Sequence, residues 1–371
     1  MIITQITPFL VDSFLLVRVY TDQGIVGNGE AGLWAHQKTV YHAIQELSQY
    51  YIGKDPTRIE HHYQAVSRST HFMGSVLNAA MSAIDVALWD ILGKSVNLPV
   101  YQLLGGKCRD KIKVFNNVTG DTLAERATSA IRNVENGFNS LRTSPFFSGW
   151  ENQTSTQVIT MAVEIVSTIR EAIGYEIDLG LEIHRNLTPD EAIILANELA
   201  PFRILYYEDP LAPQSVDALD YVARHVHIPI ATGERFYNVQ QFKGLIDQKT
   251  VSLIRPDVSL AGGITQCKKI AALAEASFVG VFPHLMGSPV NIAAFVQLDA
   301  SIPNYVLMES NIGADTFNEI IVQPLERDAG YLVVPDRPGI GVEINESKLD
   351  KFPYKPRQIS SSFGADGAVI H

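Results

Sequence analysis

Several features are scarce in this chain of 371 residues, and each scarcity argues against a class of protein. The two cysteines, Cys108 and Cys267, are too few for a disulfide framework and predict a reducing compartment. Acidic residues outnumber basic ones by 40 to 29, and the net charge of −11 argues against non-specific nucleic-acid binding. No apolar run approaches the roughly 18 residues that span a bilayer, and the N-terminus lacks a basic, cleavable signal. We therefore expect a cytoplasmic protein without nucleic-acid or membrane partners.

The order of the predicted elements indicates two parts. Residues 14–30 form a predicted β-hairpin, and helical patterns follow at 36–52 and 76–92. From residue 113, helical patterns alternate with eight short apolar segments, at 113–118, 138–143, 176–182, 203–208, 228–232, 251–256, 279–283 and 305–309. One helix begins with a capping box, in which Thr188 is the cap, Pro189 the first helical residue and Glu191 the third. This alternation predicts an α/β barrel of the (β/α) type that lacks one standard helix, with a turn-rich tail returning to the first unit.

Three glutamates occur at even intervals within the predicted barrel. Glu182, Glu208 and Glu234 each follow a short apolar run, and each lies 26 residues after the one before. Such a step suits one strand, one helix and two loops, so the three side chains should lie together on the C-terminal rim. Like charges repel unless a cation joins them, and carboxylate oxygens suit Mg²⁺. The spacing therefore predicts a magnesium site.

Further polar residues end the later strands. Asp257, His284 and Glu309 end predicted strands six, seven and eight. A carboxylate beside an imidazole stabilises its protonated form, which makes His284 a candidate general base. His184 lies two residues after Glu182, and in an extended strand it would point to the same metal. A lone glutamate at a strand end is more often solvated or a helix cap, and His184 could simply bond the next loop, but the repetition once per βα unit favours a site.

The chain resembles the mandelate racemase-like branch of the enolase superfamily over essentially its full length. The matching segments are GIVGNGEAG, SAIDVALWDILGKSVNLPVYQLLGG, YYEDPL, ATGER, RPDVSLAGGIT and PHLMGSP. Within that branch it looks most like the sugar-acid dehydratases, the galactonate dehydratases in particular. The resemblance implies a modified (β/α)7β TIM-type barrel at 113–324, an α+β capping domain at 1–112 completed by 325–371, an essential Mg²⁺ and a homo-oligomer between dimer and octamer.

The resemblance also implies roles for individual residues. Glu182, Glu208 and Glu234 would hold the metal, Asp257 and His284 would form the base dyad, and His184 would be the acid. Glu309 would contact the substrate carboxylate or the intermediate. The substrate contacts that we predict are Arg142, Ser144, Glu309, Arg235 and Trp34, although a structural role for Trp34, in a loop that could cover the barrel mouth, is equally open.

Two departures from the family pattern affect the chemistry. The first metal ligand is usually aspartate, whereas Glu182 is one methylene longer. The second barrel strand often carries Lys-x-Lys, whereas this chain has Arg142-Thr143-Ser144. Arginine stays protonated at any working pH, so Arg142 can anchor an anion but makes a poor base. No lysine occurs between Lys113 and Lys243, which excludes a lysine base on strands two to five.

These residues favour one reaction and leave two alternatives. Metal binding by a carboxylate substrate makes its α-proton more acidic, and superfamily sites remove it with lysine or histidine. Without lysine but with a second histidine, we predict an acid-sugar dehydratase that gives a 2-keto-3-deoxy product. His284 would remove the C2 proton, and His184 would assist loss of the C3 hydroxyl. The alternatives are a racemase or epimerase with two histidine bases, and a catalytically silent protein that binds sugar acids.

Overall fold

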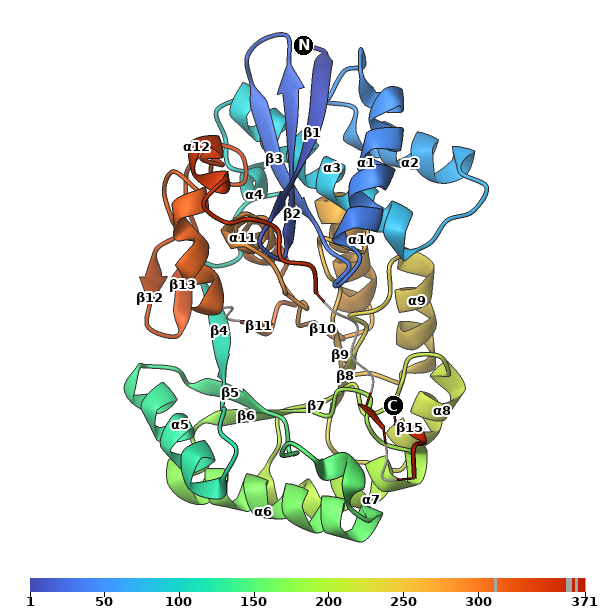
Figure 1. Cartoon of the computed structure of the whole chain (residues 1–371), viewed down its shortest axis with the longest axis vertical. Coiled ribbons are helices and arrows are strands. Elements are labelled where there is room, and N and C mark those ends of the chain that lie inside the picture. The colour runs from blue at the N-terminus through green and yellow to red at the C-terminus, as the bar shows by residue number, and fades with distance from the viewer. Residues whose placement is uncertain (310–311, 358–361, 364–365, 371) are drawn as a thin grey trace.

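The computed structural model describes residues 1–309, 312–357, 362–363 and 366–370. A capping part built mainly from the N-terminal third lies over one side of a larger barrel (Figure 1). The C-terminal segment returns to the capping part, where the backbone nitrogen of Lys355 donates to the Asp12 carbonyl oxygen at 2.8 Å. The segment predicted at 325–371 includes residues 358–361, 364–365 and 371, which lie outside the described residues.

The capping part combines a three-stranded sheet with helices. Strands β1 (Ile3–Val11), β2 (Phe14–Thr21) and β3 (Val26–Ala31) form an antiparallel sheet in that order, which confirms the predicted hairpin. Helix α3 (Ser75–Ser95) packs closely on β3, and this close approach requires glycine on the strand. A Cβ atom at Gly27 would lie 2.0 Å from the Ala87 carbonyl oxygen, and one at Gly29 would lie 2.1 Å from that of Ala83. The other helices of the capping part are α1 (Gln37–Tyr51), α2 (Ile59–Ser69) and α4 (Val100–Leu103).

Helix α3 is long and apolar enough to cross a membrane by length and composition alone, a criterion that we expected no segment to meet. Its most apolar window has a mean hydropathy of 1.4, yet 78% of that window is buried inside the protein. A helix that is hydrophobic on all sides is also what the core of a soluble protein requires. The burial of α3 against the sheet and the barrel explains its composition.

The described residues form a closed barrel of eight parallel strands and seven helices, as predicted. Strands β4 to β10 pair in sequence order, β11 pairs with β4, and a bridge from Val281 to Tyr305 closes the ring. The strands are β4 (Lys111–Asn117), β5 (Ser140–Thr143), β6 (Asp178–Glu182), β7 (Tyr207–Glu208), β8 (Ile230–Thr232), β9 (Leu253–Ile254), β10 (Gly280–Val281) and β11 (Met308–Glu309). The helices are α5 (Leu123–Glu135), α6 (Ser155–Ile173), α7 (Pro189–Leu199), α8 (Val216–Ala223), α9 (Val239–Gln248), α10 (Gly263–Glu275) and α11 (Pro289–Ser301). The predicted capping box of α7 is present, with Thr188 accepting from Glu191.

The segment after the barrel contacts both parts. It contains η3 (Ile312–Ile320), β12 (Arg327–Asp328), β13 (Tyr331–Val333), α12 (Glu346–Leu349), β14 (Ser362–Phe363) and β15 (Val369–Ile370), while short 3-10 turns η1 (Trp150–Asn152) and η2 (Ala200–Phe202) interrupt the barrel loops. Strand β13 pairs antiparallel with β4 of the barrel. Glu343 accepts hydrogen bonds from Arg18 and Lys94 of the capping part. The exact domain boundaries at 112/113 and 324/325 stay a prediction.

Candidate active site

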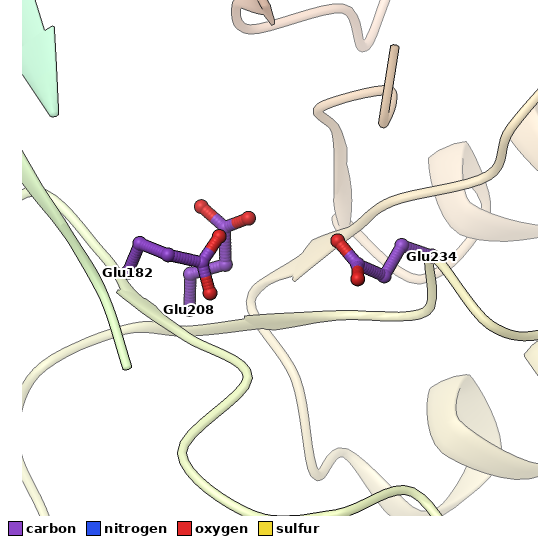
Figure 2. A group of neighbouring side chains, drawn as sticks. All are labelled: Glu182, Glu208 and Glu234. Atoms are coloured by element: carbon purple, nitrogen blue, oxygen red, sulfur yellow. The ribbon is translucent and has the colours of Figure 1, made fainter. Parts of the chain in front are cut away.

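Three glutamates meet at the ends of neighbouring barrel strands. Glu182 ends β6 and Glu208 ends β7, and they are register partners in the parallel ladder. Glu234 follows β8 by two residues. One carboxylate oxygen of each lies within 4.8 Å of the others, and Figure 2 shows the three side chains turned toward a common space. The structure therefore brings the predicted metal ligands together, while their role in metal binding stays a prediction.

Two buried arginines lie against this cluster. Arg142, on β5, donates from Nη1 to Glu182 at 3.2 Å and to Glu208 at 3.0 Å. Its Nη2 donates to Glu309 at 2.6 Å, which places the predicted substrate contact Glu309 beside the glutamates. Arg255, one residue beyond β9, is fully buried and its Nη2 lies 2.8 Å from Glu208. Each arginine also lies over an aromatic ring inside the barrel, Phe115 for Arg142 and Phe282 for Arg255.

The charges of the glutamates differ because their surroundings differ. Burial and the neighbouring Glu208 raise the pKa of Glu182 well above its usual range. Burial would also raise the pKa of Glu208, but Arg142 and Arg255 outweigh it and hold that pKa below its usual range. The charged forms of Glu182 and Glu208 therefore repel each other, and further positive charge between them would stabilise both. Three converging carboxylates, of which Glu208 is fully buried and the other two partly so, fit a divalent cation such as Mg²⁺.

Asp257 and His284, the predicted base dyad, are in direct contact, while their role as a base stays a prediction. His284 Nδ1 lies 2.8 Å from Asp257 Oδ2, and Ser259 donates to Asp257 Oδ1 from its backbone nitrogen at 2.8 Å and its hydroxyl at 2.6 Å. The other ring nitrogen, Nε2, lies 3.7 Å from Glu234. Burial would lower the pKa of His284, but Glu234 and Asp257 raise it to about 9. To act as a base, His284 must first lose this proton. The negative charge of Glu234 is the largest influence that raises the pKa of His284, and a cation held by Glu234 would offset it.

His184 departs from its predicted geometry. Strand β6 ends at Glu182, and His184 and Arg185 have left-handed backbone angles, with φ of 57° and 69°. The extended geometry that we expected is therefore wrong, because the chain turns as soon as the strand ends. The His184 ring reaches solvent, and its Nε2 lies 2.7 Å from Nη2 of Arg185. Partial burial and Arg185 lower the pKa of His184, while Glu234 and Glu208 act in the opposite direction.

The remaining predicted substrate residues lie outside these contacts. Ser144 follows β5, and its carbonyl oxygen accepts from Arg126 at 3.0 Å. Arg235 is exposed beside Glu234. Trp34 is 44% exposed in the loop after β3, and the guanidinium of Arg357 lies over its ring. Contacts of these three residues with a substrate stay predictions.

Sequence reasoning missed three charged residues of the site. Arg255 lies two residues before Asp257, so the rule that alternate residues of a strand share a face could have found it. Arg185 forms ion pairs with Glu234 and with Asp209, the latter at 3.0 Å. Arg185 directly follows His184, and Asp209 directly follows Glu208. Both have positive φ angles, which no periodic pattern in the sequence predicts.

Comparisons with known proteins show the family of this chain. The family model "Mandelate racemase / muconate lactonizing enzyme, N-terminal domain" matches residues 3–105, and "Enolase C-terminal domain-like" matches residues 124–348. The chain is 38% identical over 356 residues to a D-galactonate dehydratase of Pectobacterium atrosepticum, covering 93% of this chain and 92% of that protein.

Solved structures extend the likeness to the whole fold. A crystal structure from Agrobacterium radiobacter, described as an enolase and proposed galactarate dehydratase with sodium and L-malate bound, is 30% identical, with a TM-score of 0.94 and 100% of both chains covered. A proposed dehydratase from Mesorhizobium loti is 32% identical, with a TM-score of 0.88, covering 95% of this chain and 98% of that one. The matched family models, the barrel and the position of the glutamate cluster together assign this chain to the enolase superfamily, in its mandelate racemase-like branch.

Proposed function

We propose that this protein is a magnesium-dependent acid-sugar dehydratase that converts a 2,3-dihydroxy acid to a 2-keto-3-deoxy acid. The protein is an enzyme of the hydro-lyase class within the enolase superfamily, in keeping with its D-galactonate dehydratase relative. The L-malate in the Agrobacterium structure is a 2-hydroxy acid, which supports a substrate of that chemical class. Magnesium dependence and the individual steps belong to the proposal.

The observation that carries the proposal is the pairing of His284 with Asp257 beside the glutamate cluster. The contact of 2.8 Å to Nδ1 leaves Nε2 of His284 facing Glu234 and the site. No lysine is available on β5 to β8, because none occurs between Lys113 and Lys243. The side chains that can move a proton near neutral pH are therefore the histidines, and His184 is the second of them.

The residues divide the reaction into two proton transfers. Glu182, Glu208 and Glu234 would hold Mg²⁺, whose charge makes the α-proton of a bound carboxylate more acidic. Neutral His284 takes the C2 proton at Nε2, and the C2–H electrons form an enediolate. Those electrons then form the C2–C3 double bond as the C3–O bond breaks, and His184 gives a proton to the departing hydroxyl, which leaves as water. The resulting enol gains a proton at C3 and becomes the 2-keto-3-deoxy acid. Arg142 and Arg255 keep Glu309 in place beside this centre.

A substrate panel tests the proposal. The protein is incubated with Mg²⁺ and a set of hexonates, pentonates and hexarates in D₂O, and 2-keto-3-deoxy acids and deuterium at C2 are measured. Keto-acid formation that EDTA abolishes is the expected result. Deuterium exchange with inversion at C2 and no keto acid would instead identify a racemase or epimerase. Saturable binding without either reaction would identify a silent binding protein, and both outcomes refute the dehydratase.

A further inference from the structure

The capping sheet inserts a buried carboxylate into the barrel. Glu30, near the end of β3, is 3% exposed and accepts from the backbone nitrogen of Ser288 at 2.9 Å, from that of Asn291 at 3.2 Å, and from the Ser288 hydroxyl. Ser288 is the N-cap of α11, and Pro289 is its first residue. Glu30 thus bonds N–H groups that the first turn of a helix leaves without a partner, and its charge suits that end of the helix.

This helix end is joined directly to the proposed base. Only three residues separate His284 from Ser288, so a shift of Ser288 moves the short segment that carries His284. The backbone nitrogen of Leu285, within that segment, lies 3.4 Å from Glu309. Burial raises the pKa of Glu30 to about 7, against the hydrogen bonds from Ser288 and Asn291, and the negative charge of Asp257 adds a smaller raising influence.

A second contact from the same strand end reaches the other half of the dyad. Gly32 donates from its nitrogen to the Ser259 carbonyl oxygen at 2.9 Å, and Ser259 in turn bonds Asp257. The approach requires glycine, since a Cβ atom at Gly32 would lie 2.6 Å from the Ser259 hydroxyl. Glu30 therefore anchors the loop after β10, which carries His284, and Gly32 anchors the loop after β9, which carries Asp257.

We propose that Glu30 is a positioning residue for catalysis, which fixes His284 relative to Asp257 by anchoring the start of α11 to the capping sheet. The proposal rests on the proposed function in so far as His284 is the base. Proton transfer depends steeply on geometry, and a displacement of about 1 Å can cost about 100-fold in rate. A carboxylate suits the task because it accepts three N–H or O–H groups, whereas the amide of glutamine has a single acceptor oxygen.

The test compares Glu30→Gln with a matched control in the same part of the protein. Asp90, on α3, is likewise fully buried, and it accepts backbone N–H groups from Asn28 at 2.8 Å and Ile340 at 2.9 Å. Its hydrogen bonds lead to β3 and to the C-terminal segment, and its ion pair leads to Lys94 of the same helix at 2.8 Å, so these contacts bypass the loops that carry the dyad. Asp90→Asn therefore removes a comparable buried carboxylate without releasing α11. Ser288→Ala, which removes the hydroxyl that donates to Glu30 and accepts from Val290 but keeps the backbone N–H, is a second variant on the Glu30 side.

Steady-state kinetics, C2 deuterium exchange, thermal unfolding and amide hydrogen exchange are measured on each full-length protein. We expect Glu30→Gln to lower kcat and the C2 exchange rate by about 10–100-fold with KM changed less than about 2-fold. Amide exchange should rise in residues 285–291. Asp90→Asn should lower Tm while kcat stays within about 2-fold of the unmodified protein, and Ser288→Ala should lower kcat less than Glu30→Gln does.

Two results would overturn the positioning role. One is faster amide exchange at 285–291 in Glu30→Gln with kcat unchanged. The other is a loss of kcat that follows the loss of Tm equally in Glu30→Gln and Asp90→Asn, since that marks a general stability effect. If the unmodified protein converts no acid, the proposed function fails by itself. The rate at which diethylpyrocarbonate modifies His284, read by mass spectrometry, then still decides whether Glu30 holds that residue: it should rise in Glu30→Gln and not in Asp90→Asn, and equal rates refute the proposal.

Discussion

Replacing Arg142 by methionine tests whether an arginine supplies the positive charge that the glutamate cluster needs before a metal binds. The side chain of Arg142 is 11% exposed, and its guanidinium lies 3.2 Å from Glu182, 3.0 Å from Glu208 and 2.6 Å from Glu309. Removing one partner of a buried ion pair typically costs about 3–5 kcal/mol, because the other charge is left buried without compensation. The carboxyl groups can take up protons instead, so we expect the metal-free variant to lose about 3 kcal/mol of unfolding free energy at pH 7.

The same substitution should strengthen Mg²⁺ binding. A guanidinium and a divalent cation bound to the same carboxylates repel each other, by about 5 kcal/mol for a separation of a few ångströms at an effective dielectric constant of about 20. The carboxylates lose order when Arg142 is absent, which offsets part of this gain. A remaining gain of about 1.4–2.8 kcal/mol corresponds to a dissociation constant about 10–100-fold lower.

Calorimetric titration with Mg²⁺ and thermal unfolding in EDTA or saturating Mg²⁺ measure the two effects. Arg142→Lys, which keeps the charge but loses the branched set of donors, is the control, and it should bind Mg²⁺ no more tightly than the unmodified protein. Saturating Mg²⁺ should raise Tm more in Arg142→Met than in Arg142→Lys. The reasoning is refuted if Arg142→Met is as stable as the unmodified protein in EDTA and binds Mg²⁺ with the same affinity.

Other substitutions test the remaining parts of the site and one buried carboxyl group of the capping part, Asp85 on α3. Glu182→Gln should keep its fold by circular dichroism but lose EDTA-sensitive keto-acid formation, and full activity would remove Glu182 from the metal site. His284→Asn should lose dehydration and C2 exchange by about 10²–10⁴-fold, whereas His184→Asn should lose dehydration but keep C2 exchange. A 3-fluoro substrate should partly rescue His184→Asn alone, and the reverse rescue would mean that the two roles are exchanged. Burial raises the pKa of Asp85 from 3.8 to about 7, so the folded state keeps a proton that the unfolded chain has lost, and this contribution to stability falls as pH rises from about 4 to 7. The stability of Asp85→Asn relative to the unmodified protein should therefore increase between pH 5 and pH 8, and a constant difference would contradict the shift.

Periodicity made the barrel and the glutamate cluster predictable. The 26-residue interval corresponds to one βα unit, and Glu182 and Glu208 are indeed register partners on β6 and β7. Asp257 and His284 follow the same rhythm and form the predicted pair. Spacing along a chain fixes which strand end a residue occupies, because each strand–helix unit returns the chain to the same rim.

Spacing could not predict what happens after a strand ends. His184 lies two residues beyond Glu182, but its φ of 57° turns the chain out of the strand, and its neighbour Arg185 reaches Glu234 and Asp209 instead of solvent. Loop angles of this kind depend on tertiary contacts, which a periodic pattern does not contain. In the same way, the sequence showed the glycines of the motif around Glu30 only as part of a family resemblance and did not predict what they contact. In the structure, Gly27 and Gly29 lie against α3, and Gly32 lies against Ser259.

The use of arginine rather than lysine separates charge from proton transfer in this site. Arg142, Arg185 and Arg255 each pair with at least one member of the glutamate cluster, so positive charge is supplied from three directions. Guanidinium groups stay protonated at any working pH, so none of the three can exchange a proton with a substrate. A lysine at position 142, by contrast, could lose its proton when buried and compete with His284 for the role of base. With arginine there, the proposed proton transfers fall to His284 and His184, whose rings have different neighbours, the Asp257 carboxylate at Nδ1 of His284 and the Arg185 guanidinium at Nε2 of His184.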